Sequence, residues 1–419
     1  MPFATSAKAV IMLGTDTPIG LAIIRELGQH GVQVHGLGRS RRALGAWSRH
    51  ITSHRLRAEG DDALCRQLQE LAAATGSHCV MAISESDLMW LNRHRAALEP
   101  LNLLIPSHEA LSRVIDKSLT VPVAQSVGID VPMSVQINSI DELPAVLNGL
   151  RFPVVLKWAD PNAAGPSLRA IGLALDKSHY CYDAAELKHY LQPYAISGLF
   201  PLIQEYCPGY GLGHFVYMHA GQALLRFQHR RVREWPPEGG VSCTCDAVPL
   251  TEHSALMERS VELLRQLGWE GVAMVEYRYD PGSDRAAFME VNGRFWGSLP
   301  LAWHCGAAFA WLTYAVGGRG QVPACTPPRD DLRCRFLIPE FKRLLRILFF
   351  RNAIPDRTLH FRPARELAEF LLDFVHPRVR YYVFAWSDPL PFLADVAGAV
   401  VDTLHGLLAR CLSARPPNR

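Results

Sequence analysis

The sequence lacks the features that mark several classes of protein. Ten cysteines are scattered through 419 residues, and no CxxC pair or Cys/His ligand grouping occurs among them. This argues against a structural zinc site and fits a reducing cytoplasm, which is the expected location. Lysine and arginine exceed aspartate and glutamate by only three, so the overall charge gives no sign of a nucleic-acid partner.

Long uninterrupted apolar runs are also missing. The segment 9–14 is too short for the core of a signal peptide. The segment 392–412 contains Asp395, Asp402 and two further polar residues, which argues against a membrane span. We expect an amphipathic helix there.

What is present indicates a globular protein of two or three domains, with 49% apolar and 20% charged residues. The first hundred residues alternate between strand and helix patterns, which predicts a parallel sheet with helices on both faces. The predicted strands are 9–13, 32–38, 79–84 and 101–106, and the predicted helices are 20–30, 61–75 and 88–98.

The turn GTDTPIG (14–20) joins the first predicted strand to its helix. It lacks the GxGxxG pattern of dinucleotide-binding proteins, because Asp16 stands where the middle glycine is needed. We therefore disfavour NAD binding and interpret the glycines as tight packing. Ser84 to Asp87 follow the third strand, and we interpret them as a helix N-cap with first-turn acids rather than as an anion site.

From residue 116 the pattern changes to antiparallel strands with charged residues inside apolar runs, which predicts an α+β region. The main elements are a helix at 117–127, strands at 151–159 and 199–207, a hairpin at 222–229, a helix at 252–267, and a hairpin pairing 271–280 with 285–292.

The stretch FMEVNGRFWG (288–297) places Glu290, Asn292 and Arg294 at every second position, so they share one face of a strand. A five-residue loop at 281–285 would set Glu276 directly opposite Glu290. Two adjacent carboxylates with an amide oxygen are suited to Mg²⁺, and an arginine beside them is suited to phosphate. The alternative is an exposed sheet face with no site.

Two other charged residues favour the site. Lys157 and Glu205 each interrupt an apolar strand, where a charged side chain needs a partner.

At this point the chain resembles the ATP-grasp superfamily, in the branch of the carbamoyl-phosphate synthetase large chain and the carboxylate–amine ligases. Six segments match in the family's order, up to about residue 320: IDK (115–117), GIDVP (128–132), FPVVLKW (152–158), LIQEYCPG (202–209), WEGVAMVEY (269–277) and FMEVNGRFWGS (288–298).

The resemblance implies a fold and a set of site residues. It implies an α/β pre-ATP-grasp domain with a parallel sheet (1–112), an α+β ATP-grasp domain with antiparallel sheets (113–322, with 113–198 and 199–322 as its parts), and a mainly helical C-terminal extension (323–419). By position, the ATP-binding residues would be Lys117, Lys157, Glu205, Tyr206 and Cys207, the magnesium ligands Glu276, Glu290 and Asn292, and the catalytic residues Arg294, Arg231 and Arg233. For Arg231 and Arg233, solvated surface charge is an equally good interpretation.

The implied activity is an ATP- and Mg²⁺-dependent ligase, with Mn²⁺ as an alternative metal, that joins a small-molecule carboxylate to an amine through an acyl-phosphate. The resemblance leaves open a carboxylase or carbamoyl-phosphate-forming enzyme, a non-catalytic nucleotide-binding module, and a homodimer.

Two departures from the family pattern stand out. The segment 159–172, which corresponds to the family's flexible phosphate-binding loop, has only two glycines, and 208–215 offers no acid for the ribose.

The segment FKRLLRILFFR (341–351) is basic and amphipathic. Such a helix can lie on a membrane surface or a partner, but we favour a helix that faces the core and extends its basic side chains to solvent.

Overall fold

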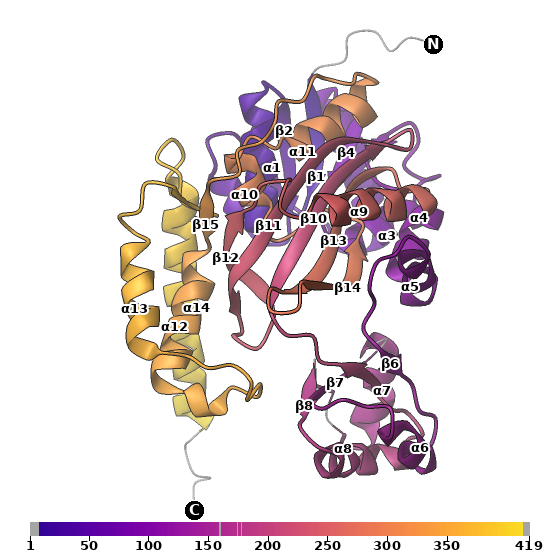
Figure 1. The fold of residues 1–419 in the computed structure, drawn as a ribbon. Helices are drawn as coiled ribbons and strands as arrows, with labels where there is room; N and C mark the ends of the chain where they lie inside the picture. The colour runs from indigo at the N-terminus through magenta and orange to yellow at the C-terminus, as the bar shows by residue number, and fades with distance from the viewer. Residues whose placement is uncertain (1–7, 159–160, 174, 177, 414–419) are drawn as a thin grey trace, which may run out of the picture.

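A computed structural model describes residues 8–413 except 159, 160, 174 and 177, and Figure 1 shows the arrangement of its parts. A five-stranded parallel sheet comes first, followed along the chain by a four-stranded antiparallel sheet and a seven-stranded, mostly antiparallel sheet. Helices of the C-terminal extension lie together beyond one side of the large sheet (Figure 1). The expected fold class is confirmed.

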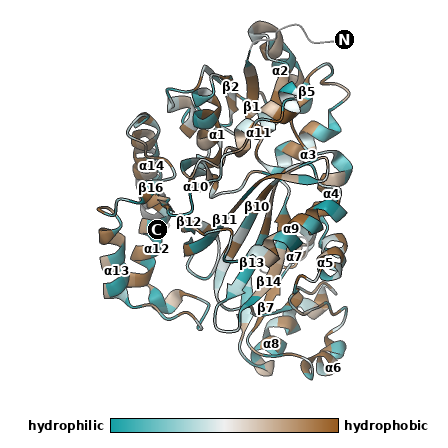
Figure 2. Ribbon diagram, turned by 45° about the horizontal axis from the view of Figure 1, so that its top comes forward, coloured by the Kyte–Doolittle hydropathy of each residue, from teal (hydrophilic) through white to brown (hydrophobic). Residues whose placement is uncertain are grey.

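The N-terminal sheet has the strand order β3-β2-β1-β4-β5, with every pair parallel. Its central strand is wholly apolar and buried, as the hydropathy colouring of Figure 2 shows, because helices cover both faces of a parallel sheet. The elements are β1 (Ala9–Leu13), α1 (Pro18–Gln29), β2 (Gln33–Gly38), η1 (Leu44–Trp47), β3 (Ser53–Leu56), α2 (Asp61–Thr75), β4 (Cys79–Ala82), α3 (Glu85–Arg93), β5 (Asn102–Leu103) and α4 (His108–Ile115).

The turn from β1 into α1 is a packing feature. A Cβ atom on Gly20 would lie 2.3 Å from the carbonyl oxygen of Gly14, so only glycine fits there. The carboxylate of Asp16 accepts the backbone N–H groups of Arg39 and Ser40, which fixes the end of β2. Ser84 caps α3, as predicted.

The small lobe is the sheet β6-β9-β7-β8 with its helices, and it has a separate hydrophobic core. Lys157 and Glu205 are the last residues of β7 and β9. Residues Pro161–Ala170, which we compared with a flexible loop, form helix α7; residues 159 and 160 lie outside the described part. Its elements are β6 (Ser134–Val135), η2 (Ile140–Glu142), α6 (Leu143–Leu147), β7 (Val154–Lys157), α7, β8 (His179–Cys181), α8 (Ala184–Leu191), η3 (Gln192–Ile196) and β9 (Leu202–Glu205). Helix α5 (Lys117–Ser126) precedes the lobe and packs against β14 (Arg285–Asn292) and α9 (Ser254–Gln266).

The large sheet has the order β14-β13-β10-β11-β12-β15-β16. The hairpin predicted at 271–280 and 285–292 is confirmed, whereas the strand predicted to end at residue 229 continues to Trp235. The elements are β10 (Tyr210–His219), β11 (Gln222–Trp235), β12 (Val241–Ala247), α9 (Ser254–Gln266), β13 (Gly271–Asp280), β14 (Arg285–Asn292), α10 (Leu299–His304), α11 (Phe309–Leu312), the π-helix η4 (Thr313–Gly318), β15 (Arg333–Arg335) and β16 (Val379–Tyr381).

The large sheet and the N-terminal sheet share their hydrophobic cores. Alternate residues of β1 contribute to two clusters: Met12 lies in the same cluster as Phe215, and Ile11 lies in the same cluster as Val216. Because side chains alternate along a strand, neighbouring residues of β1 and β10 pack into different cores. The boundaries at residues 112 and 322 stay predictions.

The C-terminal extension contains α12 (Leu337–Phe349), η5 (Arg351–Ala353), α13 (Pro363–Leu372) and α14 (Leu390–Ser413). The expectation that 341–351 turns its apolar side to the core is wrong in part. Phe341 and Phe349 are exposed, whereas Glu340 and Arg343 are buried in ion pairs. Within the described residues, no helix has the length and apolarity needed to cross a membrane.

Glu26 of α1 should make the stability depend on pH. Its Oε1 accepts the backbone N–H of Trp311 at 2.6 Å, and burial raises its pKa to about 8 from 4.5, with the backbone hydrogen bonds only partly offsetting the shift. Between these pH values the unfolded chain releases a proton that the folded protein keeps. The free energy of unfolding should therefore fall as pH rises through this window, by up to about 1.4 kcal/mol per pH unit.

Urea denaturation across this pH range measures that slope. The variant Glu26→Gln should flatten it, and the exposed Glu59→Gln should leave it unchanged. Equal slopes in the wild type and Glu26→Gln would contradict the assignment.

Candidate functional site

Two carboxylates face each other across the hairpin of β13 and β14. Glu276 pairs with Glu290 in the strand register, as we predicted. The loop comprises residues 281–284, one fewer than predicted, because a register shift between Glu276 and Tyr277 takes up the extra residue. Neighbouring carboxylates repel, so each requires a cation close by.

Both acids have such a cation. Nη2 of Arg231 lies 2.7 Å from Oε1 of Glu276, and Nζ of Lys117 lies 3.4 Å from Oε2 of Glu290. Burial alone would raise the pKa of Glu290, but Lys117, Asn292 and Arg294 outweigh it and the net shift is downward. Burial would lower the pKa of Arg231, yet the carboxylates of Glu276 and Glu234 raise it. Glu290 is therefore held ionised, and Arg231 is held as a cation beside Glu276.

Arg231 reaches Glu276 across an intervening strand. Arg231 lies on β11 and Glu276 on β13, with β10 between them. A Cβ atom on Gly211 of β10 would stand 2.7 Å from Cδ of Arg231, so this glycine makes room for the arginine. The second residue of the stretch YGLG (210–213) is therefore needed as glycine for the Arg231–Glu276 contact, which the sequence did not reveal.

Asn292 and Arg294 continue the row that begins at Glu290. Nδ2 of Asn292 donates to Oε1 of Glu290 at 3.0 Å, and Nη2 of Arg294 donates to Oδ1 of Asn292 at 2.9 Å. The three predicted residues therefore form one hydrogen-bonded chain, although β14 itself ends at Asn292.

Lys157 approaches this row from the small lobe. Its Nζ donates to Oε1 of Gln204 at 3.0 Å. Burial lowers its pKa, as does Lys117 to a smaller degree, and the charges of Glu290 and Glu276 partly offset this. Two lysines and two acids from separate elements thus act on one another. Gln204, which sequence reasoning missed, stands next to Glu205 in LIQEYC.

The segment Glu205, Tyr206 and Cys207, which we predicted to bind ATP and call the hinge, lies apart from the acid row in its side-chain contacts. Arg285 donates to both carboxylate oxygens of Glu205, at 2.5 and 3.1 Å, and this contact holds the pKa of Glu205 below its usual value. The hydroxyl of Tyr206 lies 3.1 Å from Oδ2 of Asp356. Burial raises the pKa of Cys207 to about 11. The side chains of Glu205 and Tyr206 are therefore paired away from the acid row, and a contact of 205–207 with ATP stays a prediction.

Arg233 lies apart from this group. Its Nη1 is 2.6 Å from Glu340 and 2.7 Å from Asp373, in the buried contact between β11 and the C-terminal helices. Register shifts on both sides of Arg233 turn it away from the direction of Arg231. Regular alternation would have placed the two arginines on one face.

Two further residues that we did not predict support Arg231. Glu234 accepts from Nη1 of Arg231 at 2.9 Å and from Nη1 of Arg278 at 3.2 Å. Arg278 stands two residues after Glu276 on β13, so both side chains are expected on one face of the strand. This alternation could have identified Arg278 from the sequence.

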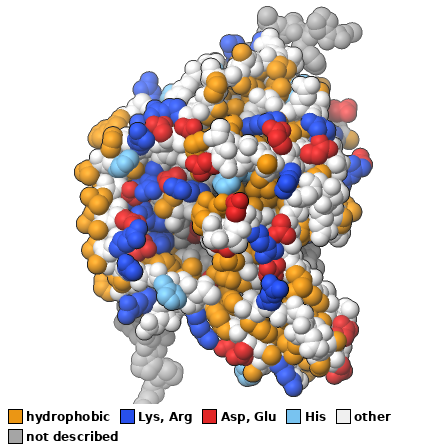
Figure 3. Space-filling model, in the orientation of Figure 1, with side chains coloured by type: hydrophobic (Ala, Val, Ile, Leu, Met, Phe, Trp, Pro, Cys, Tyr) orange, Lys and Arg blue, Asp and Glu red, His pale blue; other side chains and the backbone are white. Residues whose placement is uncertain are grey.

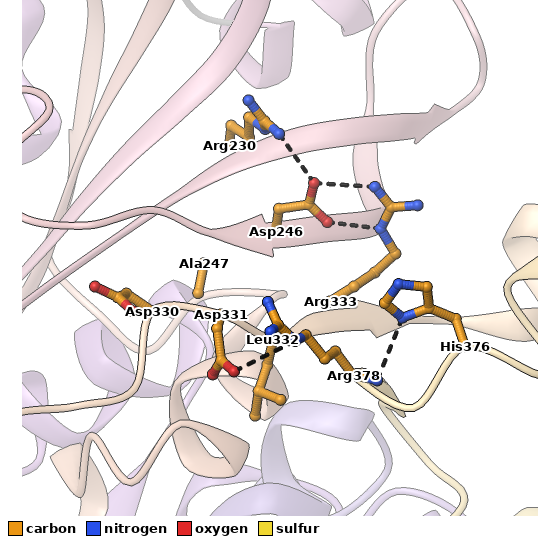
Figure 4. Close-up of a pocket in the computed structure, with 9 residues that line it drawn as sticks. All are labelled: Arg230, Asp246, Ala247, Asp330, Asp331, Leu332, Arg333, His376 and Arg378. Atoms are coloured by element: carbon orange, nitrogen blue, oxygen red, sulfur yellow. Dashed lines mark hydrogen bonds and ion pairs between the residues drawn. The ribbon is translucent and has the colours of Figure 1, made fainter.

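A separate pocket of about 240 Å³ lies where β12 and β15 meet the C-terminal extension (Figure 4). Asp246 stands between Arg230 and Arg333, with contacts of 3.3 and 2.7 Å, and Arg378 is 3.7 Å from Asp331. The charged side chains that line this pocket largely neutralise one another. None of the predicted site residues lines it.

Comparison with known proteins supports the architecture. Residues 245–307 match the model of the carbamoyl-phosphate synthase L chain, ATP-binding domain. The L-amino acid ligase of Bacillus licheniformis is similar in structure, with 16% identity, a TM-score of 0.54, and 75% of each chain covered. Comparison with curated proteins gives no match.

Two carboxylase structures are similar as well. Biotin carboxylase from Campylobacter jejuni has 13% identity and a TM-score of 0.60, covering 77% of this chain and 74% of that one. The biotin carboxylase domain of the Hydrogenobacter thermophilus 2-oxoglutarate carboxylase has 13% identity and a TM-score of 0.58, covering 79% and 74%.

The chain has the ATP-grasp fold. The resemblance inferred from six short segments is thereby confirmed. Because identities of 13–16% carry the fold and not the substrates, the roles of the ATP-grasp site residues stay predictions.

Arg233 should matter for stability and not for the site. Arg233→Met leaves Glu340 and Asp373 buried without this cation, which should cost about 3–5 kcal/mol of unfolding free energy. Denaturant titration measures this, with the exposed Arg365→Met as the matched control, for which about 0.5 kcal/mol is expected. Wild-type stability in Arg233→Met would contradict the assignment.

Proposed function

We propose that this protein is an ATP-dependent ligase that joins a small-molecule carboxylate to an amine through an acyl-phosphate. The observation that carries the proposal is the Glu276–Glu290 pair with its row of Asn292 and Arg294, approached by Lys117 and Lys157. The group combines oxygen ligands for a hard metal ion with cations for phosphates, which is the combination that phosphoryl transfer requires.

The donor set fits Mg²⁺. Two carboxylates and an amide oxygen are all hard oxygen ligands, and Mg²⁺ completes its shell with water and substrate phosphates. Within the described residues, no group of three His, Cys, Asp or Glu side chains is arranged to hold a metal alone. Glu276, Glu290 and Asn292 would therefore hold the ion together with ATP. When bound, Mg²⁺ would neutralise part of the negative charge of the ATP phosphates, and Mn²⁺ could take the same place.

The reaction follows from the charges of the site. An oxygen of the substrate carboxylate attacks the γ-phosphorus of ATP, the bond to the β–γ bridging oxygen breaks, and ADP leaves. Lys117 and Lys157 hold the phosphates, and Arg294 stabilises the charge on the transferred group. The amine nitrogen then attacks the acyl carbon, the carbon–oxygen bond to phosphate breaks, and the nitrogen loses a proton. Positioning and charge account for the catalysis.

Arg231 has a positioning role in this proposal. It neutralises Glu276, and its side chain occupies the space that the lack of a side chain on Gly211 leaves. If Glu276 served as a metal ligand, the guanidinium of Arg231 would be free to hold an anionic substrate. Arg233 is fixed among acids of the extension, and we assign it a structural role.

Bicarbonate is the second candidate substrate. Two of the similar structures described above are biotin carboxylases, and the TM-score of 0.60 for one of them is higher than the 0.54 for the amino acid ligase. Only one EVNGR segment occurs in the chain, whereas the large synthetase doubles the whole unit, so carbamoyl phosphate formation is less well supported.

Metal-dependent nucleotide binding should disappear when the acid row is changed. Mg²⁺ with ATP at a hundred times Kd should stabilise the wild type by about 2.7 kcal/mol, and ATP with a chelator should do far less. Glu290→Gln and Asn292→Ala should lose most of this gain in thermal denaturation. The exposed Glu270→Gln is the matched control and should keep it. An undiminished gain in both site variants would remove the magnesium assignment.

An acyl-phosphate should be trapped when the amine is omitted. With Mg²⁺, ATP and a panel of carboxylic acids, hydroxylamine should give a hydroxamate and an equal amount of ADP, and Glu290→Gln should give at least about a hundredfold less. ADP release with bicarbonate alone would favour the second candidate. Nucleotide binding without hydroxamate from any acid would favour a non-catalytic module.

A further inference from the structure

The C-terminal extension turns its charged side inward. Arg233 and Arg335 share the carboxylate of Glu340, at 2.6 and 2.7 Å, and all three are at most 4% exposed. Arg343 likewise pairs with Glu366 at 2.6 Å. Helices of soluble proteins normally bury their apolar side, so these helices must place apolar residues elsewhere.

The outer side of the extension is apolar. Leu367 and Leu371 of α13 are four residues apart, which is the spacing of one helix face, and Phe374 lies in the turn that follows the helix. Leu393 extends the surface onto α14. We call the following six residues, which are 40 to 89% exposed, the apolar face: Phe341, Leu367, Leu371, Phe374, Trp386 and Leu393.

A series of ring contacts makes the apolar face continuous. Phe341 of α12 contacts Phe370, which contacts Phe374, with ring centroids 6.3 and 5.4 Å apart. Tyr381 and Phe384 continue the series to Trp386, whose ring lies 4.9 Å from Phe384. Figure 3 shows hydrophobic side chains along this margin of the molecule, with lysine and arginine beside them.

The charge around the apolar face has one sign. Of the acids between residues 337 and 403, a stretch that the structure describes throughout, only Asp402 is exposed. Residues 323–403 hold twelve lysines and arginines and ten acids. The exposed basic residues of the stretch 337–403 are Lys342, Arg351, Arg357, Arg362, Arg365 and Arg378.

We propose that the apolar face docks this protein onto a membrane surface that contains anionic lipids. A highly exposed tryptophan, exposed leucines and phenylalanines, and a basic surround are the chemistry of interfacial binding. A second copy bound through the same face would bring two basic surrounds together, which disfavours that occupant. Since no described helix is able to span a bilayer, the contact is peripheral.

Sedimentation of the full chain with vesicles tests the proposal. Vesicles of three parts phosphatidylcholine to one part phosphatidylglycerol should bind the wild type, with at least about tenfold weaker binding to phosphatidylcholine alone and in high salt. Leu371→Glu and Trp386→Glu should each weaken binding by about tenfold or more. Both residues are exposed, so the variants should fold.

Matched variants separate the apolar and charge contributions. Ile196→Glu changes an 84% exposed isoleucine on the small lobe and should bind as the wild type does. Lys342→Gln with Arg362→Gln should reduce binding to the anionic vesicles only. Failure of the wild type to bind anionic vesicles would overturn the proposal. The proposal would also be overturned if the protein bound no vesicles and instead formed a concentration-dependent dimer in ultracentrifugation that Leu371→Glu dissociates.

Discussion

Repulsion between the carboxylates of Glu276 and Glu290 is the constraint around which the site is built. The strand register places them directly opposite each other. Separating the two residues would require breaking the backbone hydrogen bonds between β13 and β14. Compensation therefore has to come from other elements, and it comes from α5 through Lys117 and from β11 through Arg231. Four separate segments of chain are thereby tied to one pair of acids.

The same compensation explains a glycine in the neighbouring strand. A side chain on Gly211 would block the path of Arg231 over β10. The acid on β13 thus constrains both the residue type on β10 and the charge on β11. A divalent cation held by Glu276 and Glu290 would replace this internal compensation, because it would place two positive charges directly between the carboxylates.

The C-terminal extension also contains buried carboxylates that need cations nearby. Its acids pair with arginines of the large sheet, and this leaves apolar side chains on the outside. The loop after η5 also carries Asp356, which accepts from the hydroxyl of Tyr206 at the hinge. The extension therefore contacts the segment 205–207 as well as the large sheet.

The sequence by itself determined β1, β2, β4, the hairpin of β13 with β14 and the facing of Glu276 with Glu290, because alternation is a local property of the chain. It did not indicate β3 or β12. It did not separate Arg231 from Arg233, since the bulges that turn them apart depend on pairing with β12. It also did not reveal that Glu340 and Arg343 are inside while Phe341 is outside. Only the tertiary structure decided this, because burial of a charge depends on which opposite charge the fold brings to it.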